Sequence, residues 1–144
     1  MSFKDSSNQS GVVSELTAQL DIIKRGFMCQ PPVSRDAVYD LIIDFGEGQM
    51  ETAQVKTMSG NSITKIVDRS GEVVSRNGKT RNSLDYAAHG VDWLIGVSKL
   101  GEVFYYKLET YSQIPGKSFS VNKYPPDDFP FRIVPTRHAL RRVS

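Results

Sequence analysis

Two stretches of alternating apolar and polar residues, separated by Gly46-Glu47-Gly48, constrain this chain more than any other feature. Residues 38–45 and 49–58 each repeat with a period of two, which is the pattern of strands that bury one face. A Gly-X-Gly sequence between two such runs is typical of a hairpin loop, because glycine accepts backbone angles that other residues avoid. The sequence therefore predicts an antiparallel hairpin over residues 38–58.

The predicted hairpin brings three polar side chains together on one face. If the loop is centred on Glu47, residues whose numbers add to 94 stand opposite each other, so Asp40 faces Gln54. Directly opposed side chains lie about 5 Å apart and diagonal ones about 7–8 Å apart, which makes Lys56 the diagonal neighbour of Asp40. We therefore expect a carboxylate, an amide and an ammonium to converge, whereas a register slip of one residue would separate them.

These residue types suit the hydrolysis of a phosphodiester. That reaction uses a cation of the Mg²⁺ type, which prefers oxygen ligands and few protein carboxylates. Asp40 would supply one carboxylate, while the Gln54 side chain and the Val55 backbone carbonyl would supply neutral oxygens. Lys56 would orient or deprotonate the attacking water, or balance charge on the phosphate. The alternative interpretation is that these polar residues form an ordinary solvent-exposed face of the hairpin. Against it, Asp40 lies between two apolar residues of the same face, which indicates that the face is partly buried.

An amphipathic helix is expected before the hairpin, between Ser10 and Arg25. Its large apolar residues recur at steps of three and four, at Val13, Leu16, Leu20 and Ile23. Such a stripe is the usual core-facing side of a surface helix. Glu15 lies at the edge of the stripe, so packing this helix on the sheet would bring a second carboxylate to the site.

The rest of the chain predicts further strands and one short helix. Strands are expected over residues 27–30, 61–67, 73–74, 91–97 and 103–108, and the short helix over residues 83–89. From Ile114 onward, five prolines favour irregular, extended chain. This order predicts an α/β fold with a mixed central sheet flanked by helices. We expect residues 1–9 to be disordered and residues 10–144 to form a single domain with a Pro-rich, basic C-terminal extension.

Composition limits the class of protein and suggests a partner. With 144 residues, 39% hydrophobic, the chain suits one globular domain, and its apolar runs are too short to cross a membrane. Its single cysteine excludes an internal disulfide and fits a reducing cytoplasm. The net charge of +2 is too small to indicate nucleic acid by itself. One polar stretch carries residues that could contact DNA bases. The alternative interpretation of this stretch is a plain surface loop. The candidate DNA contacts are Arg69, Arg76, Asn77, Lys79, Arg81 and Asn82.

Four short motifs resemble the PD-(D/E)XK nuclease superfamily, and within it most closely the small intron-associated homing endonucleases of cyanobacteria and phages. The motifs are Gly11-x-x-Ser14-Glu15, Arg25-Gly26-Phe27, Tyr39-Asp40-Leu41-Ile42-Ile43-Asp44 and Gln54-Val55-Lys56-Thr57. The later segments Val91-Asp92-Trp93-Leu94-Ile95 and Val103-Phe104-Tyr105-Tyr106 extend the likeness to roughly residues 10–110. Two positions depart from the superfamily pattern, since Tyr39 replaces its proline and Gln54 replaces its second acid.

The resemblance implies a restriction-endonuclease-like core and a defined site. Glu15, Asp40, Gln54 and the Val55 carbonyl would be metal ligands, and Lys56 would complete the catalytic set. The implied activity is Mg²⁺-dependent, sequence-specific cleavage of double-stranded DNA by a homodimer or homotetramer in a prokaryotic or phage-infected cell, with Mn²⁺ able to substitute. Two alternatives stay open: a Holliday junction resolvase on the same fold, and a catalytically inactive DNA-binding protein, because Gln54 removes a charge from the site.

Overall fold

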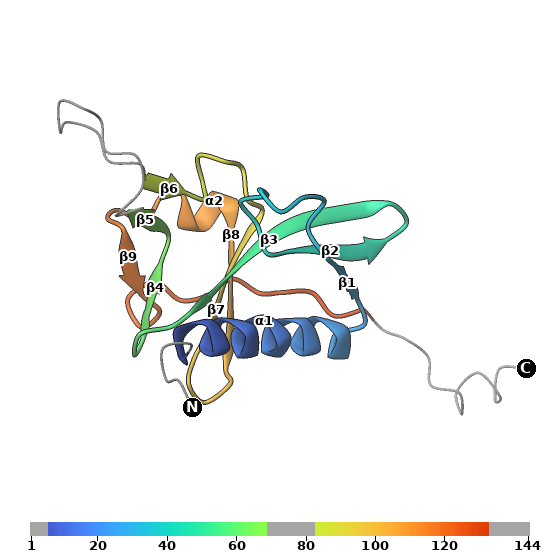
Figure 1. The fold of residues 1–144 in the computed structure, drawn as a ribbon, viewed down its shortest axis with the longest axis horizontal. Helices are drawn as coiled ribbons and strands as arrows, with labels where there is room; N and C mark the ends of the chain where they lie inside the picture. The colour runs from blue at the N-terminus through green and yellow to red at the C-terminus, as the bar shows by residue number, and fades with distance from the viewer. Residues whose placement is uncertain (1–5, 69–82, 133–144) are drawn as a thin grey trace, which may run out of the picture.

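A five-stranded sheet organises the computed structural model, which describes residues 6–68 and 83–132 (Figure 1). The strand order is β1-β2-β3-β7-β8, with β3 and β7 parallel and all other neighbours antiparallel. The strands span Met28–Gln30 (β1), Leu41–Gly46 (β2), Gln49–Thr57 (β3), Trp93–Val97 (β7) and Val103–Lys107 (β8). The expectation of an α/β fold with a mixed central sheet is therefore confirmed.

The β2–β3 hairpin has the register that the sequence predicts. Leu41 pairs with Ala53 and Ile43 with Glu51, so the numbers of paired residues add to 94. The pairing shifts by one residue only at the loop, where Gly46, Glu47 and Gly48 all have positive φ angles. Glycine is needed on both sides of Glu47, because three successive left-handed residues would be costly with side chains.

Helix α1 (Ser6–Lys24) covers one face of the sheet, as Figure 1 shows. It begins four residues before the expected start at Ser10, so residues 6–9 are helical rather than disordered. The expected core stripe is wrong: Val13, Leu16 and Leu20 are each more than half exposed. The buried side carries Ser14, Ala18 and Ile22 instead. Small side chains at two of these positions let the helix approach the sheet closely, and Ser14 Oγ lies 2.7 Å from Thr57 Oγ1 of β3.

The opposite face of the sheet is covered by small elements that gather at one end of it (Figure 1). These are two antiparallel pairs and a short helix, β4 (Ser62–Thr64) with β9 (Ser118–Ser120), β5 (Ile66–Asp68) with β6 (Ser83–Asp85), and α2 (Leu108–Tyr111). Together with the sheet they enclose a second apolar core around Leu94, Tyr106 and Phe119. The helix expected over residues 83–89 is wrong, because residues 83–85 pair with β5 and Asp85 Oδ1 then accepts a hydrogen bond from Ala87 N in a turn (3.0 Å). The strand expected over residues 73–74 lies outside the described residues.

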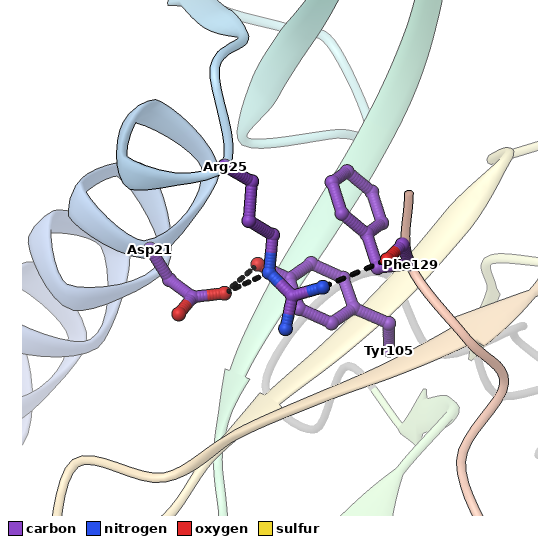
Figure 2. A network of polar contacts seen from close by, with 4 residues as sticks. All are labelled: Asp21, Arg25, Tyr105 and Phe129. Atoms are coloured by element: carbon purple, nitrogen blue, oxygen red, sulfur yellow. Dashed lines mark hydrogen bonds and ion pairs between the residues drawn. The ribbon is translucent and has the colours of Figure 1, made fainter. Parts of the chain in front are cut away.

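The Pro-rich segment after β9 crosses the α1 face of the sheet as an ordered strap, residues 126–132. Phe129 is buried in the core of that face and stacks on Tyr105 of β8, with ring centroids 4.1 Å apart. Figure 2 shows how Arg25, just after α1, fixes the strap: Nη1 donates to the Phe129 carbonyl (2.8 Å) and Nε to Asp21 (2.9 Å). The Tyr105 hydroxyl donates to the same Asp21 oxygen. The strap therefore joins the end of α1 to the sheet.

No helix among the described residues is long and apolar enough to span a lipid bilayer.

Candidate functional site

Asp40 lies at the point where β2 and β3 stop pairing. Its backbone N–H donates to the carbonyl of Ala53 (2.8 Å), the residue that Leu41 pairs with, so Asp40 lies beside β3 one residue before the paired part of β2. Past Ala53, no strand within residues 6–68 and 83–132 pairs with β3 on that side, and Asp40 Oδ2 accepts the Val55 N–H (2.9 Å). Burial raises the pKa of Asp40, while the Val55 N–H and the positive charge of Lys56 act to lower it.

Lys56 follows Gln54 by two positions, on the same face of β3. Burial lowers the pKa of its ammonium, and the negative charge of Asp40 opposes that change. Lys56 Nζ donates to the hydroxyl of Tyr86 (3.3 Å) and lies 5.5 Å from the centre of the Tyr86 ring. This pairing keeps a half-buried cation near Asp40 without a close ion pair. The hydroxyl and the ring therefore hold the ammonium in place.

Glu15 reaches the same site from α1. The bond between Ser14 and Thr57 ties that turn of the helix to β3, and the next residue, Glu15, then lines a cavity of about 470 Å³ together with Asp40. Burial raises the pKa of Glu15, and the negative charge of Asp40 raises it further. The two carboxylates thus repel each other.

The donor set fits a divalent cation with oxygen ligands. Asp40 and Glu15 are the two carboxylates, and no cluster of three His, Cys, Asp or Glu side chains exists within residues 6–68 and 83–132. Gln54 is only 9% exposed, and its Nε2 donates a long hydrogen bond (3.5 Å) to the Val55 carbonyl, so the two neutral groups expected as ligands lie side by side. Two acids with neutral oxygens suit a hard cation that keeps several water ligands.

The structure thus brings Asp40, Gln54, Val55 and Lys56 together on one hairpin, with Glu15 facing Asp40 across the cavity. The six candidate DNA contacts between Arg69 and Asn82 lie outside the described residues. The strands that flank them pair antiparallel, with Asp68 opposite Ser83.

Two residues at the site were not singled out from the sequence. Tyr86 went unnoticed because residues 83–89 were expected to be helical, although the alternation of Leu84 and Tyr86 is a strand signal. Arg35 lines the cavity beside Glu15 and Asp40, where its positive charge suits a phosphate. No sequence pattern marks Arg35, because it lies in an irregular loop after Pro31-Pro32.

A larger cavity of about 700 Å³ lies elsewhere, and two of its acids have structural partners. Glu51 Oε1 accepts the Trp93 Nε1–H (2.7 Å), and Asp92 Oδ2 accepts the Thr52 N–H (2.8 Å). These hydrogen bonds fix β3 against β7 at their ends. The cavity lined by Glu15 and Asp40 is the candidate site because acidic groups with raised pKa values meet there, and size does not enter the choice.

Comparisons with known proteins agree with this geometry. The model of the family described as PD-(D/E)XK endonuclease matches residues 5–115. Among solved structures, the bacterial homing endonuclease I-Ssp6803I is similar, with a TM-score of 0.63 and 17% identity over 80% of this chain and 77% of that one. The Holliday junction resolvase Hjc of Archaeoglobus fulgidus gives a TM-score of 0.48 and 12% identity over 80% of this chain and 87% of its own. No curated protein sequence matches significantly.

The likeness to I-Ssp6803I shows a restriction-endonuclease-like fold, as the sequence motifs implied. The family match includes Glu15 and the whole hairpin with Asp40, Gln54 and Lys56. Endonucleases of this family hydrolyse phosphodiester bonds of DNA and generally use divalent metal ions. By this match over most of its length, the chain belongs to the PD-(D/E)XK endonuclease family.

Proposed function

We propose that this protein is a Mg²⁺-dependent, sequence-specific endonuclease of the homing type that cuts double-stranded DNA. The observation that carries the proposal is the presence of Asp40, Gln54 and Lys56 on one hairpin, with Asp40 bonded to the Val55 N–H and Glu15 lining one cavity with Asp40. Homing is favoured over other activities by the resemblance of the motifs around Glu15, Asp40 and Lys56 to the intron-associated members. The activity named for the structurally similar I-Ssp6803I supports the same choice.

The proposed roles follow from the chemistry of each group. Asp40 and Glu15 hold the cation with their carboxylates, and Gln54 and the Val55 carbonyl contribute neutral oxygens. When bound, Mg²⁺, or Mn²⁺ in its place, activates a water and neutralises charge on the phosphate. Lys56, whose pKa burial lowers, orients the attacking water and accepts or shares its proton. Val55 N–H keeps the Asp40 carboxylate fixed.

The substrate sets the proposed assembly. A duplex offers two antiparallel scissile strands, so one site in each chain requires at least a homodimer, and a tetramer is the larger form. The segment from Arg69 to Asn82 reads the bases, with Arg and Lys facing guanine and Asn facing adenine. The protein acts as a single domain in the cytoplasm of a prokaryotic or phage-infected cell.

Cleavage of three DNAs in Mg²⁺ tests the proposal: a four-way junction, a plasmid of unrelated sequence, and a library of duplex sites. We expect cutting of one long site from the library. Lys56→Ala should abolish cleavage and leave binding largely unchanged, because the lysine acts on the reaction rather than on the duplex. Lys99→Ala is the matched control, since Lys99 is exposed in the β7–β8 turn.

The outcomes separate the alternatives. Selective cutting of the junction would replace homing by junction resolution on the same fold. Intact binding with no cutting of any DNA would mean that the uncharged Gln54 leaves the site inactive. Full activity of Lys56→Ala would refute the assignment of the site.

A further inference from the structure

The outer face of α1 carries large apolar side chains that nothing within the described residues covers. Val12, Val13, Leu16, Leu20 and Ile23 are between 45% and 61% exposed, and the helical repeat places them in one row along α1. Scattered exposed leucines need no explanation, but a contiguous row marks a surface that another molecule contacts.

The spacing of this row is that of a helix seam. Val13, Leu16, Leu20 and Ile23 follow one another at steps of three, four and three, which are the a and d positions of two heptads. The residues buried against the sheet, Ser14, Ala18 and Ile22, occupy the opposite side of the helix. α1 therefore has two apolar faces, and its own sheet covers one of them.

Charge excludes DNA as the partner of the outer face. The charged residues of α1 are Glu15 and Asp21, both on its inner side, and Lys24, which is exposed at the end of the helix, so the row carries a single cation beside its last residue. Glu15 lines the site cavity, and Asp21 bonds Arg25 and Tyr105, as Figure 2 shows. A phosphate backbone needs cations. An uncharged apolar row suits an equally apolar partner, and it does not repel a copy of itself.

We propose that a second copy of this chain docks on the α1 outer face, defined by Val12, Val13, Leu16, Leu20 and Ile23, to form the homodimer. The inference rests on the proposed function, which requires two sites for two strands. The five side chains offer on the order of 500 Å² per copy, so complete burial in a symmetric pair would cover about 1,000 Å², which is the lower limit for a specific interface. Since α1 also carries Glu15, helix pairing couples the positions of the two active sites.

Sedimentation velocity of the full chain over a range of concentrations tests the proposal. The wild-type protein should sediment with twice the mass of one chain. Leu16→Glu combined with Leu20→Glu should raise the dissociation constant at least about 100-fold, because two apolar anchors become charged and face each other. Both positions are exposed and glutamate favours helices, so the helical circular dichroism should be unchanged. Leu100→Glu, at a residue 87% exposed in the β7–β8 turn, should remain dimeric.

Three results would overturn the inference. These are a wild-type monomer at every concentration, a double variant that stays dimeric, and a wild-type monomer that associates only after removal of residues 133–144. The last would mean that this segment covers α1 in the same chain. Lys56→Ala separates the inference from the proposed function, since it should be inactive yet dimeric. A dimer that depends on α1 in a protein that cuts no DNA would refute the function and keep the interface.

Discussion

Replacing Phe129 by alanine should destabilise the protein strongly, although Phe129 lies in an irregular segment among prolines. The ring is 5% exposed and meets four aromatic neighbours. Their ring centroids lie 4.1 Å (Tyr105), 4.9 Å (Trp93), 5.7 Å (Phe45) and 6.0 Å (Phe27) away. The backbone bond from Arg25 to the Phe129 carbonyl does not depend on the side chain and survives the change.

The expected loss is about 3 kcal/mol of unfolding free energy. A buried phenylalanine replaced by alanine costs about 3–5 kcal/mol, through the lost transfer of the ring and the cavity it leaves. We take the lower end because the strap carries no strand pairing and can move inward to close part of the cavity. For a domain of this length the loss corresponds to roughly 10 °C in the midpoint of thermal unfolding.

Phe131→Ala is the matched control. Phe131 belongs to the same strap but is 70% exposed, and it contacts the Arg25 guanidinium from 4.5 Å. Losing one exposed cation–π contact should cost less than about 1 kcal/mol.

Urea unfolding at one protein concentration, followed by Trp93 fluorescence and circular dichroism, measures both variants. The midpoint should fall for Phe129→Ala without a change in slope. A loss below about 1 kcal/mol for Phe129→Ala, or equal losses for both variants, would show that the strap does not complete the core.

Three further predictions concern the site. Tyr86→Phe keeps the ring beside Lys56 but removes the hydroxyl that accepts a hydrogen bond from Lys56 Nζ. We expect kcat for DNA cleavage to fall about tenfold while KM is unchanged. An unchanged kcat would show that Tyr86 does not contribute to the site. Gln54→Glu adds a third carboxylate, and the Mg²⁺ concentration for half-maximal cleavage should drop about tenfold, whereas an increase would place Gln54 away from the cation. Glu15→Gln should raise the thermal midpoint of the metal-free protein at pH 8 and have little effect below about pH 4. The sign follows because the raised pKa of Glu15 makes the folded state bind its proton more tightly than the unfolded state, so stability is lost as pH rises. Mg²⁺ should then stabilise the wild type more than the variant, and the same pH response in both would contradict the repulsion between Glu15 and Asp40.

The hairpin was predictable because its information is local. Alternation fixes which side chains share a face, and Gly46 and Gly48 fix the loop, so the pairing of Leu41 with Ala53 and the position of Asp40 beside β3 follow without knowledge of the rest of the chain. The β7–β8 pair was predictable for the same reason, since a short turn joins two apolar runs.

The errors arose where the outcome depends on distant residues. Residues 83–85 form a strand only because β5 lies beside them, after a long intervening segment. The face of α1 was misjudged because both faces are apolar, and periodicity does not tell which one the sheet covers. The sheet takes the face with Ser14 and Ala18, where small side chains allow close approach, and it leaves Leu16 and Leu20 outside.

The strap also bears on the order in which the protein folds. Arg25 and Phe129 are 104 residues apart in sequence, so their contact closes nearly the whole described chain into one loop. Closing a loop of this length costs conformational entropy, and this cost comes before the contacts of the strap can offset it. Contacts between residues far apart in sequence therefore slow folding. We therefore expect the hairpin and the β7–β8 pair to form first and the strap to dock last. A late refolding phase of Trp93 fluorescence, after most of the circular dichroism signal has returned, would be its signature, because Phe129 packs against the Trp93 ring.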